Sequence, residues 1–291
     1  MKRREFLQLL PLCSSIPGFL TLGRDLRFSQ DDPDALLCTK KFELAVARGL
    51  QKELIGEVIV EIGKSFLGTD YVAHALEVSG EERLVVNLRG LDCVSFCENA
   101  VVLARCIKKN AMTFDDYKRE LQYLRYRGGV IDRYPSRLHY FTDYIYDGEK
   151  KGIWRNVTKA LGGERYRKRI NFMSTHPEAY RQLRENPEFV ETIRKQEAEI
   201  SQREHWYIPK ADLRTVEAKV KNGDILAITT SIEGLDVSHT GVALWQRGRL
   251  HMMHAPDVGH NVTITELPLV EYLAKNRRQT GIIVARPIEP T

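Results

Sequence analysis

Apolar residues recur at helical spacing over much of the first half of the chain. Between Phe42 and Phe66 they follow one another at intervals of three and four, which predicts an amphipathic helix pair. A third helix is predicted over residues 114–126. Another periodic run begins directly behind Asp92, with apolar positions at Phe96, Cys97, Ala100, Val101, Ala104 and Ile107. The helix behind Asp92 is therefore expected to be buried.

The pattern changes to strands after Asn222. Apolar runs bounded by turn residues predict strands at residues 225–230, 237–245, 249–254, 262–265 and 281–286. With the helical first half, they predict an α+β fold in which the helices pack on a C-terminal antiparallel sheet.

A two-residue turn at Arg247-Gly248 would fix the register of one hairpin, because Gln246 would then face Arg249. In that register His239 and His254 are diagonal neighbours on the same face of the sheet. The glycine at 241 on that face is expected to leave room for another group.

The Asp92-Cys93 pair stands where an extended apolar segment (residues 84–88) gives way to the buried helix. Asp is a favoured N-cap, so Cys93 is expected on the first helical turn. The helix dipole favours an anion there, and thiol pKa values fall at such positions. The alternative is that Cys93 is only a small core residue.

Charge gives little support to a nucleic-acid partner. The chain has 291 residues, of which 43% are hydrophobic and 29% charged, and a formal charge of +5. Residues 1–24 hold four basic residues and one acidic residue, which accounts for +3 and leaves +2 for residues 25–291.

The first 24 residues resemble a bacterial export signal of the twin-arginine type, with Lys2-Arg3-Arg4 ahead of a short apolar stretch. We therefore expect a periplasmic or otherwise exported protein without stable membrane insertion. Lipid attachment at Cys13 is less favoured, because Leu12 is bulky where a small residue is required. Residues 25–40 are expected to be a linker.

The remaining cysteines are Cys38, Cys93, Cys97 and Cys106. Cys97 and Cys106 are nine residues apart on one predicted helix, about 13 Å at 1.5 Å per residue, which is too far for a disulfide. The cysteine spacing does not match a metal site, and we expect no metal or other cofactor.

A cysteine nucleophile needs a base and a group that orients the base. Cys93, His239 and His254 would supply these in the order nucleophile, base and orienting residue. Two histidines on one strand face could instead be half of a metal site or ordinary core residues, but no carboxylate is suitably spaced as a third ligand.

A loop rich in Arg and Tyr follows the third predicted helix and includes Tyr134 and Arg137. Such a loop could hold an anionic, sugar-bearing ligand through guanidinium groups and aromatic faces. It could equally be a solvated loop at a domain edge.

The motif order resembles the NlpC/p60 superfamily of papain-like cell-wall peptidases and amidases. The motifs are Asp92-Cys93, Gly223-Asp224, Ser238-His239-x-Gly241-Val242 and His254-Ala255. Longer segments, including Tyr134-Pro135-Ser136-Arg137-Leu138-His139-Tyr140, resemble its N-acetylmuramoyl-L-alanine amidase-like branch, first catalogued as a domain of unknown function. This resemblance spans roughly residues 42–288.

The resemblance implies a papain-like fold, with one catalytic domain over residues 41–291 and a helical insertion at about 110–210. It implies a Cys93-His239-His254 triad and a substrate-facing Tyr71 from a Pro-Tyr-x-x-Gly motif, although Asp70 replaces the Pro and His74 the Gly. Val94-Ser95 also replaces the small pair that follows Cys in the superfamily.

The implied activity is cleavage of the N-acetylmuramoyl–L-alanine bond in peptidoglycan fragments. Asp92, Tyr134 and Arg137 are expected beside Tyr71 at the substrate. One alternative is an endopeptidase that cuts D-glutamyl-diaminopimelate, and another is a cell-wall-binding module without activity.

Overall fold

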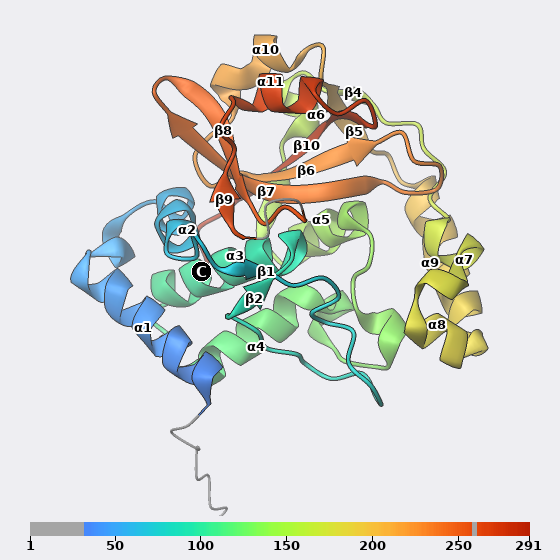
Figure 1. The fold of residues 1–291 in the computed structure, drawn as a ribbon, viewed down its shortest axis with the longest axis horizontal. Helices are drawn as coiled ribbons and strands as arrows, with labels where there is room; N and C mark the ends of the chain where they lie inside the picture. The colour runs from blue at the N-terminus through green and yellow to red at the C-terminus, as the bar shows by residue number, and fades with distance from the viewer. Residues whose placement is uncertain (1–31, 258–260) are drawn as a thin grey trace, which may run out of the picture. The chain divides into compact units, whose positions relative to one another are not determined.

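The computed structural model describes residues 32–257 and 261–291. The expected export signal at 1–24, with Cys13, lies outside the described residues. The linker expected over 25–40 is wrong in its described part, because helix α1 begins at Pro33 (Figure 1). Asp32 caps this helix by accepting a hydrogen bond from the Asp34 backbone, and Cys38 is fully buried in the core.

The helices of the first half of the chain, α1 to α4, agree with the periodicity of its apolar residues. The bounds of all the helices are α1 (Pro33–Ala47), α2 (Ile55–Lys64), α3 (Cys93–Lys108), α4 (Phe114–Arg125), α5 (Phe141–Lys150), α6 (Thr158–Leu161), α7 (Phe172–Thr175), α8 (Arg181–Glu185), α9 (Pro187–Gln202), α10 (Leu213–Val216) and α11 (Leu269–Ala274). Short 3-10 helices lie at η1 (Leu50–Lys52), η2 (Arg127–Gly129), η3 (Tyr134–Ser136), η4 (Pro177–Ala179) and η5 (Glu217–Lys219).

The main sheet joins strands from the second half of the chain. Strands β1 (Asp70–Tyr71) and β2 (Gly90–Leu91) form a separate pair. The strands of the main sheet are β3 (Trp154–Asn156), β4 (Glu164–Arg165), β5 (Trp206–Pro209), β6 (Ile225–Thr230), β7 (Val237–Gln246), β8 (Arg249–His254), β9 (Thr263–Ile264) and β10 (Gln279–Pro287). The order in the main sheet is β4-β5-β10-β6-β7-β8-β9, with β3 also on β10, and every pairing in it is antiparallel.

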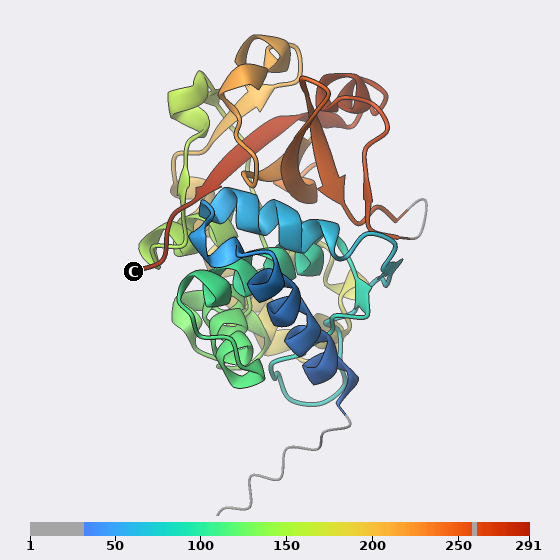
Figure 2. The same cartoon turned by 90° about the vertical axis from the view of Figure 1, so that its left-hand side faces the viewer.

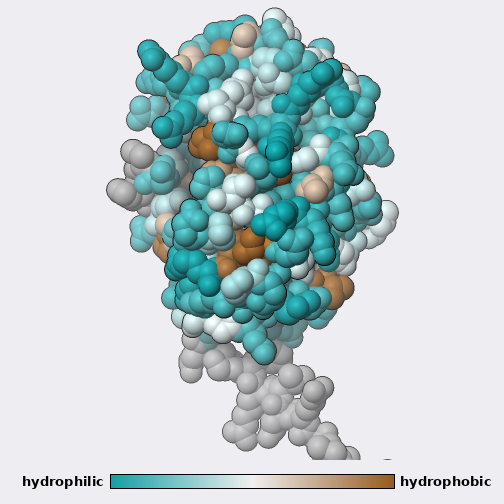
Figure 3. Space-filling view, turned by 90° about the vertical axis from the view of Figure 1, so that its right-hand side faces the viewer, coloured by the Kyte–Doolittle hydropathy of each residue, from teal (hydrophilic) through white to brown (hydrophobic). Residues whose placement is uncertain are grey.

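The segment between α3 and β6 departs from the expected helical insertion. Helices α4, α5 and α9 form there as expected, but β3, β4 and β5 from the same segment extend the main sheet. Helices α7 to α9 enclose a small core of their own. The face in Figure 3 is mainly hydrophilic, with hydrophobic side chains exposed in small, separate groups.

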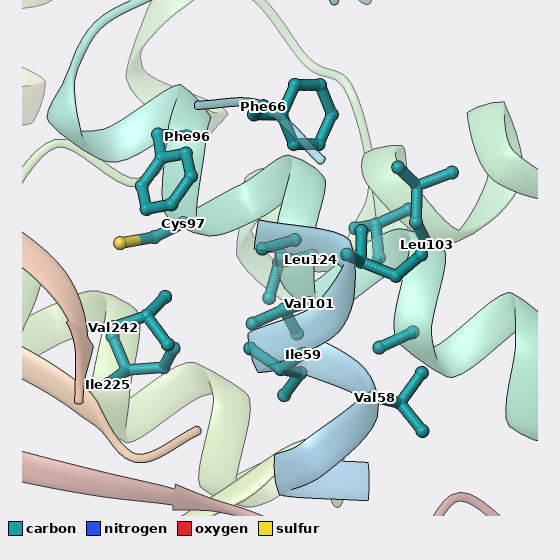
Figure 4. Packing of buried hydrophobic residues seen from close by; sticks show 14 of the residues in the cluster. Val58, Ile59, Phe66, Phe96, Cys97, Val101, Leu103, Leu124, Ile225 and Val242 are labelled. Atoms are coloured by element: carbon teal, nitrogen blue, oxygen red, sulfur yellow. The ribbon is translucent and has the colours of Figure 1, made fainter. Parts of the chain in front are cut away.

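Side chains on the two faces of the sheet belong to two different hydrophobic cores, because successive strand residues point to opposite sides. One face packs against α2 and α3, and Figure 4 shows Ile59 of α2 and Val101 of α3 on the side of their helices toward Ile225 and Val242. The other face packs against α10 and α11. Figure 2 shows the sheet above helices α1 to α4.

The predicted hairpin register is confirmed, because Gln246 pairs with Arg249. The expected space at Gly241 is absent: a Cβ at this position would lie 2.5 Å from Cγ of Met252. Glycine is therefore required there for packing and not for an incoming group.

No helix in residues 32–257 and 261–291 is long and apolar enough to cross a membrane.

Candidate active site

Cys93 is the first residue of α3, as the Asp92 cap predicted. Oδ1 of Asp92 accepts hydrogen bonds from the Ser95 backbone (2.7 Å) and the Ser95 hydroxyl (2.8 Å), and Oγ of Ser95 accepts one from the Asp92 backbone (2.9 Å). This capping box fixes the first turn of the helix. The Asp92 carboxylate thus has a structural partner, although the residue also lines the cavity beside Cys93.

Tyr71 reaches Cys93 through a short parallel pairing. Strand β1 pairs with β2, so that Tyr71 lies opposite Leu91, two residues before Cys93. The extended segment expected at 84–88 has no strand partner, and the pairing falls on Gly90–Leu91 instead. Gly90 is needed there, because its Cβ would lie 2.4 Å from Cγ2 of Val72.

His239 and His254 meet across β7 and β8. Nε2 of His239 lies 2.7 Å from Nδ1 of His254, and the two rings are nearly perpendicular, at 84°. This contact follows from the hairpin register, which places the two residues as diagonal neighbours. On the far side of His254, Tyr272 packs edge-on at 5.5 Å between ring centroids.

Thr240 connects the histidine strand to the cysteine helix. Its hydroxyl donates to the Cys93 carbonyl oxygen at 2.9 Å, and its Oγ1 lies 3.7 Å from Sγ of Cys97. Because Thr240 follows His239 directly, this bond fixes the strand that carries one ring against the turn that carries the thiol.

Cys93 and His239 line the same cavity, of about 370 Å³, which we call the first cavity. Its walls bring together every site residue predicted from sequence except His254. They also hold Glu77, Glu98, Arg125, Tyr144 and Asp236.

Tyr134 and Arg137 are buried in the wall of the first cavity. The Arg137 guanidinium lies over the Tyr134 ring at 4.9 Å and pairs with Glu77 (2.5 Å) and more distantly with Glu82 (3.7 Å). Arg137 therefore anchors the loop before α3, and these two carboxylates already neutralise its charge before a ligand binds. The Tyr134 hydroxyl is buried without a hydrogen-bond partner among the described residues.

A buried ion pair at the cavity was not predicted from the sequence. Nε of Arg125 donates to both carboxylate oxygens of Glu98 (3.1 and 3.0 Å), and Nη2 donates to Oε2 (2.6 Å); the Tyr144 hydroxyl also binds Glu98. The available signal was Glu98 itself, a charged residue on the buried face of the predicted helix, which must have a partner.

Asp236 was missed as well. Its carboxylate accepts from the backbone and hydroxyl of Thr142, both at 2.8 Å, and from the Val237 backbone at 2.7 Å. The residue joins the start of α5 to the start of β7, three residues before His239. Burial raises the pKa of Asp236.

Burial favours the neutral forms of the thiol and both imidazoles. It raises the pKa of Cys93 to about 12, with a further increase from Asp92, and hydrogen bonds from Thr240 oppose this only in part. Burial lowers the pKa of His239 to about 4 and, with His239 as neighbour, that of His254 to about 3. The thiolate expected from the helix dipole is therefore disfavoured in the resting cavity.

Cys38, Cys93, Cys97 and Cys106 are free thiols. In the described part of the chain, no group of three or more His, Cys, Asp or Glu side chains is arranged to hold a metal ion.

Comparisons with known proteins agree with this architecture. A model of the AmiA-like family, described as N-acetylmuramoyl-L-alanine amidase-like, matches residues 61–282. A crystal structure of an N-acetylmuramoyl-L-alanine amidase from Bacteroides uniformis is 37% identical, with a TM-score of 0.77 over 80% of this chain and 99% of that one. No curated protein matches the chain.

Two further structures widen the comparison. A Bacteroides fragilis protein with the provisional name xylanase is 39% identical, with a TM-score of 0.74 over 77% of this chain and 98% of its own. A Legionella pneumophila protein shares the fold at 19% identity, with a TM-score of 0.66 over 87% of this chain and 94% of its own. Since the family model covers most of the chain, the protein belongs to the N-acetylmuramoyl-L-alanine amidase-like family.

Proposed function

We propose that this protein is a cysteine amidase of the papain-like NlpC/p60 type, which cleaves the N-acetylmuramoyl–L-alanine bond of peptidoglycan fragments without a metal. The observation that carries the proposal is the 2.7 Å contact between His239 and His254 beside a cavity that also contains Cys93. A nucleophile at a helix start, a base and a residue that orients the base are the parts that this chemistry requires.

In the proposed reaction, Sγ of Cys93 attacks the carbonyl carbon of the muramyl lactyl group, and its proton passes to Nδ1 of His239. In the tautomer that this step requires, Nε2–H of His239 donates to Nδ1 of His254, and Nδ1 of His239 accepts the thiol proton. The backbone N–H of Cys93, at the helix start, is the proposed donor to the oxyanion.

Collapse of the tetrahedral intermediate breaks the carbon–nitrogen bond. His239 gives its proton to the alanine nitrogen, and the peptide leaves as an amine. Water, deprotonated by His239, then attacks the thioester. This step releases the muramyl carboxylic acid and returns the proton to the thiol.

The charge of the first cavity favours the amidase over the endopeptidase. In the endopeptidase the acyl group on Cys93 would be a D-glutamyl residue with a free carboxylate. The cavity holds the carboxylates of Glu77, Asp92, Glu98 and Asp236 against the guanidinium groups of Arg125 and Arg137, and both guanidinium groups are already paired. An uncharged muramyl group meets less repulsion there.

The same contacts disfavour a glycosidase. Two carboxyl groups must act as acid and base or nucleophile in most such enzymes. Here Glu98 is held by Arg125, Asp92 by the helix cap and Glu77 by Arg137. The protein should therefore release no sugar from xylan.

Mass spectrometry of defined muropeptides, after incubation with the purified protein, tests the proposal. Free muramyl sugar and an intact stem peptide are expected. A muramyl-L-alanyl-D-glutamate product, together with a released fragment that begins with diaminopimelate, would identify the endopeptidase instead. A module that only binds cell wall would retain the muropeptides and release no product.

Cys93→Ala should abolish the reaction and keep the fold, because one small residue replaces another. Cys106→Ala, at a buried position farther along α3, is the matched control and should retain activity, as should Cys97→Ala. A dead Cys97→Ala with an active Cys93→Ala would refute the assignment of the nucleophile.

We also propose that residues 1–24 direct export to the periplasm, supported by Arg3-Arg4 ahead of an apolar stretch. Arg3→Lys together with Arg4→Lys should leave the protein in the cytoplasm on cell fractionation. Unchanged export of this double variant would exclude the twin-arginine route.

A further inference from the structure

We propose that a second cavity, on the other side of His239, binds the acidic stem peptide that leaves as the amine. This proposal rests on the amidase function proposed above, and it assigns the two halves of the substrate to two separate cavities.

The second cavity has a volume of about 740 Å³ and shares Ser238 and His239 with the first cavity. Cys93 lines only the first cavity, whereas His254 lines only the second. In the proposed reaction the acyl group stays bonded to Cys93, while the amine receives its proton from His239. The acyl side of the substrate therefore belongs in the first cavity, and the leaving side passes His239 into the second.

A buried side chain with an unpaired hydrogen-bond acceptor is among the residues that line the second cavity. Gln279 is only 7% exposed, and its Oε1 has no partner among the described residues. The β-bulge between Gln279 and Gly281 interrupts the register with β6 at this point, and such bulges re-aim a side chain. An unpaired buried acceptor is unfavourable, and an N–H of a bound peptide would satisfy it.

The charges around the second cavity suit a ligand with carboxylates. Lys275 and Arg278 lie at its rim, both exposed, and neither forms an ion pair with a described residue. The carboxylates on the same lining are Asp257 and Glu266. This balance contrasts with the first cavity, where carboxylates outnumber guanidinium groups and both guanidinium groups are paired. A stem peptide carries the free carboxylates of D-glutamate and diaminopimelate, whereas the muramyl group carries none once its lactyl carboxyl is in the amide.

The test compares two substrates, N-acetylmuramoyl-L-alanine and N-acetylmuramoyl-L-alanyl-γ-D-glutamyl-diaminopimelate. Gln279→Met keeps the side-chain length and removes the acceptor. It should lower kcat/KM by about 3- to 10-fold for the long substrate, and by clearly less for the short one. Lys275→Ala with Arg278→Ala should lower kcat/KM for the long substrate by about 2- to 5-fold, and this loss should shrink as salt is added.

Arg277→Ala is the matched control, because Arg277 is an exposed residue between Lys275 and Arg278 that does not line the cavity. Arg277→Ala should leave kcat/KM for both substrates unchanged. A second readout is independent of turnover: the free tripeptide L-alanyl-γ-D-glutamyl-diaminopimelate should bind to the Cys93→Ala protein and should bind more weakly when Gln279→Met is added. Titration calorimetry measures this difference.

The outcomes separate the two proposals. If the wild-type protein releases muramyl sugar but the variants affect both substrates equally, or neither, the peptide subsite is wrong and the amidase stands. If the wild-type protein releases no muramyl sugar from either substrate, the amidase function fails and the subsite fails with it. If Gln279→Met disturbs folding, the double variant Lys275→Ala with Arg278→Ala still tests the subsite, because it changes only exposed side chains.

Discussion

Oγ1 of Thr240 donates a 2.9 Å hydrogen bond to the carbonyl oxygen of Cys93. The proposed nucleophile and the proposed base, Cys93 and His239, come from segments almost 150 residues apart, since this bond spans a sequence separation of 147. Thr240 is almost completely buried, so water cannot replace the bond. This hydroxyl group, next to His239, therefore helps to hold Cys93 and His239 in position, together with the packing of the sheet on α3.

Thr240→Val replaces that hydroxyl with a methyl group of the same shape. We expect kcat to fall by about 10-fold with little change in KM, because the thiol and the imidazole lose their alignment. The free energy of unfolding should fall by about 1 kcal/mol. Thr240→Ser keeps the hydroxyl and should restore kcat. Equal kcat values in the Val and Ser variants would show that the bond is only structural.

His239 and His254 should respond differently to substitution, because in the proposed reaction only His239 exchanges protons with the thiol and the amine. His239→Ala should reduce the rate by about 10⁴-fold or more, the upper end of general acid–base effects. His254→Asn retains an acceptor for the ring N–H of His239 and should lose the least activity. The activity of His254→Ala should lie between those of His254→Asn and His239→Ala. Steady-state kinetics of the three variants give the order.

Equal and complete loss of activity in His254→Asn and His239→Ala, with Cys93 alkylated at the wild-type rate, would contradict this division of roles. It would indicate that His254 contacts the substrate.

The local parts of this site could be predicted from the sequence. The Asp92 cap and the β7–β8 register depend on residues close together in the chain, so a capping residue and a two-residue turn suffice to predict them. The register alone brings the imidazoles of His239 and His254 together.

The long-range parts could not be predicted. Strands β1 and β2 are two residues each, too short to show periodicity, yet their pairing places Tyr71 beside Cys93. The partner of Glu98 is 27 residues away, and β3 to β5 join the sheet from a segment with a helical pattern. In each case the partner is determined by tertiary packing and not by neighbouring residues.

The pH dependence of the reaction follows from the lowered pKa of His239. The base must be neutral to accept the thiol proton, and burial places its pKa at about 4 instead of 6.5. The acid limb of kcat/KM should therefore fall near pH 4 to 5. The rate of Cys93 alkylation should rise about tenfold per pH unit from pH 6 to 9, since the thiol pKa is raised to about 12. A flat alkylation rate over this range would instead indicate a thiolate–imidazolium pair.

Stability should also depend on these histidines. Burial lowers the pKa of His139 and His254 to about 3 and that of His239 to about 4, all from 6.5. Below pH 6.5 the unfolded chain therefore binds protons that the folded chain does not, and stability falls as pH falls toward 4. The expected loss approaches about 1.4 kcal/mol per histidine for each pH unit well below pH 6.5, and it is smaller between pH 7.5 and 6.5. Urea unfolding at pH 7.5, 6.5 and 5.5 measures it, and equal stability at pH 6.5 and 5.5 would contradict the lowered values.

His74 occupies a backbone conformation that favours glycine. Its φ is 56°, in the left-handed region that glycine adopts without strain. A side chain in the left-handed region costs about 1–2 kcal/mol, while Gly loses more entropy on folding. His74→Gly should therefore raise the free energy of unfolding by about 0.5–1 kcal/mol. His74→Ala, which keeps the Cβ, should not raise it, and urea unfolding of the two variants measures the difference.

The same pair of variants tests whether the His74 ring takes part in the reaction. The ring is exposed at the mouth of the first cavity, near Tyr71. Because the ring is exposed and forms no hydrogen bond with a described residue, the backbone turn and not the imidazole should be what the site requires. Both variants should therefore keep kcat/KM within about 3-fold of the wild-type value, a difference below 1 kcal/mol. A large loss of kcat/KM in both variants, with His74→Gly more stable than the wild type, would instead place the ring in contact with the substrate, and the strained turn would then serve to hold it there.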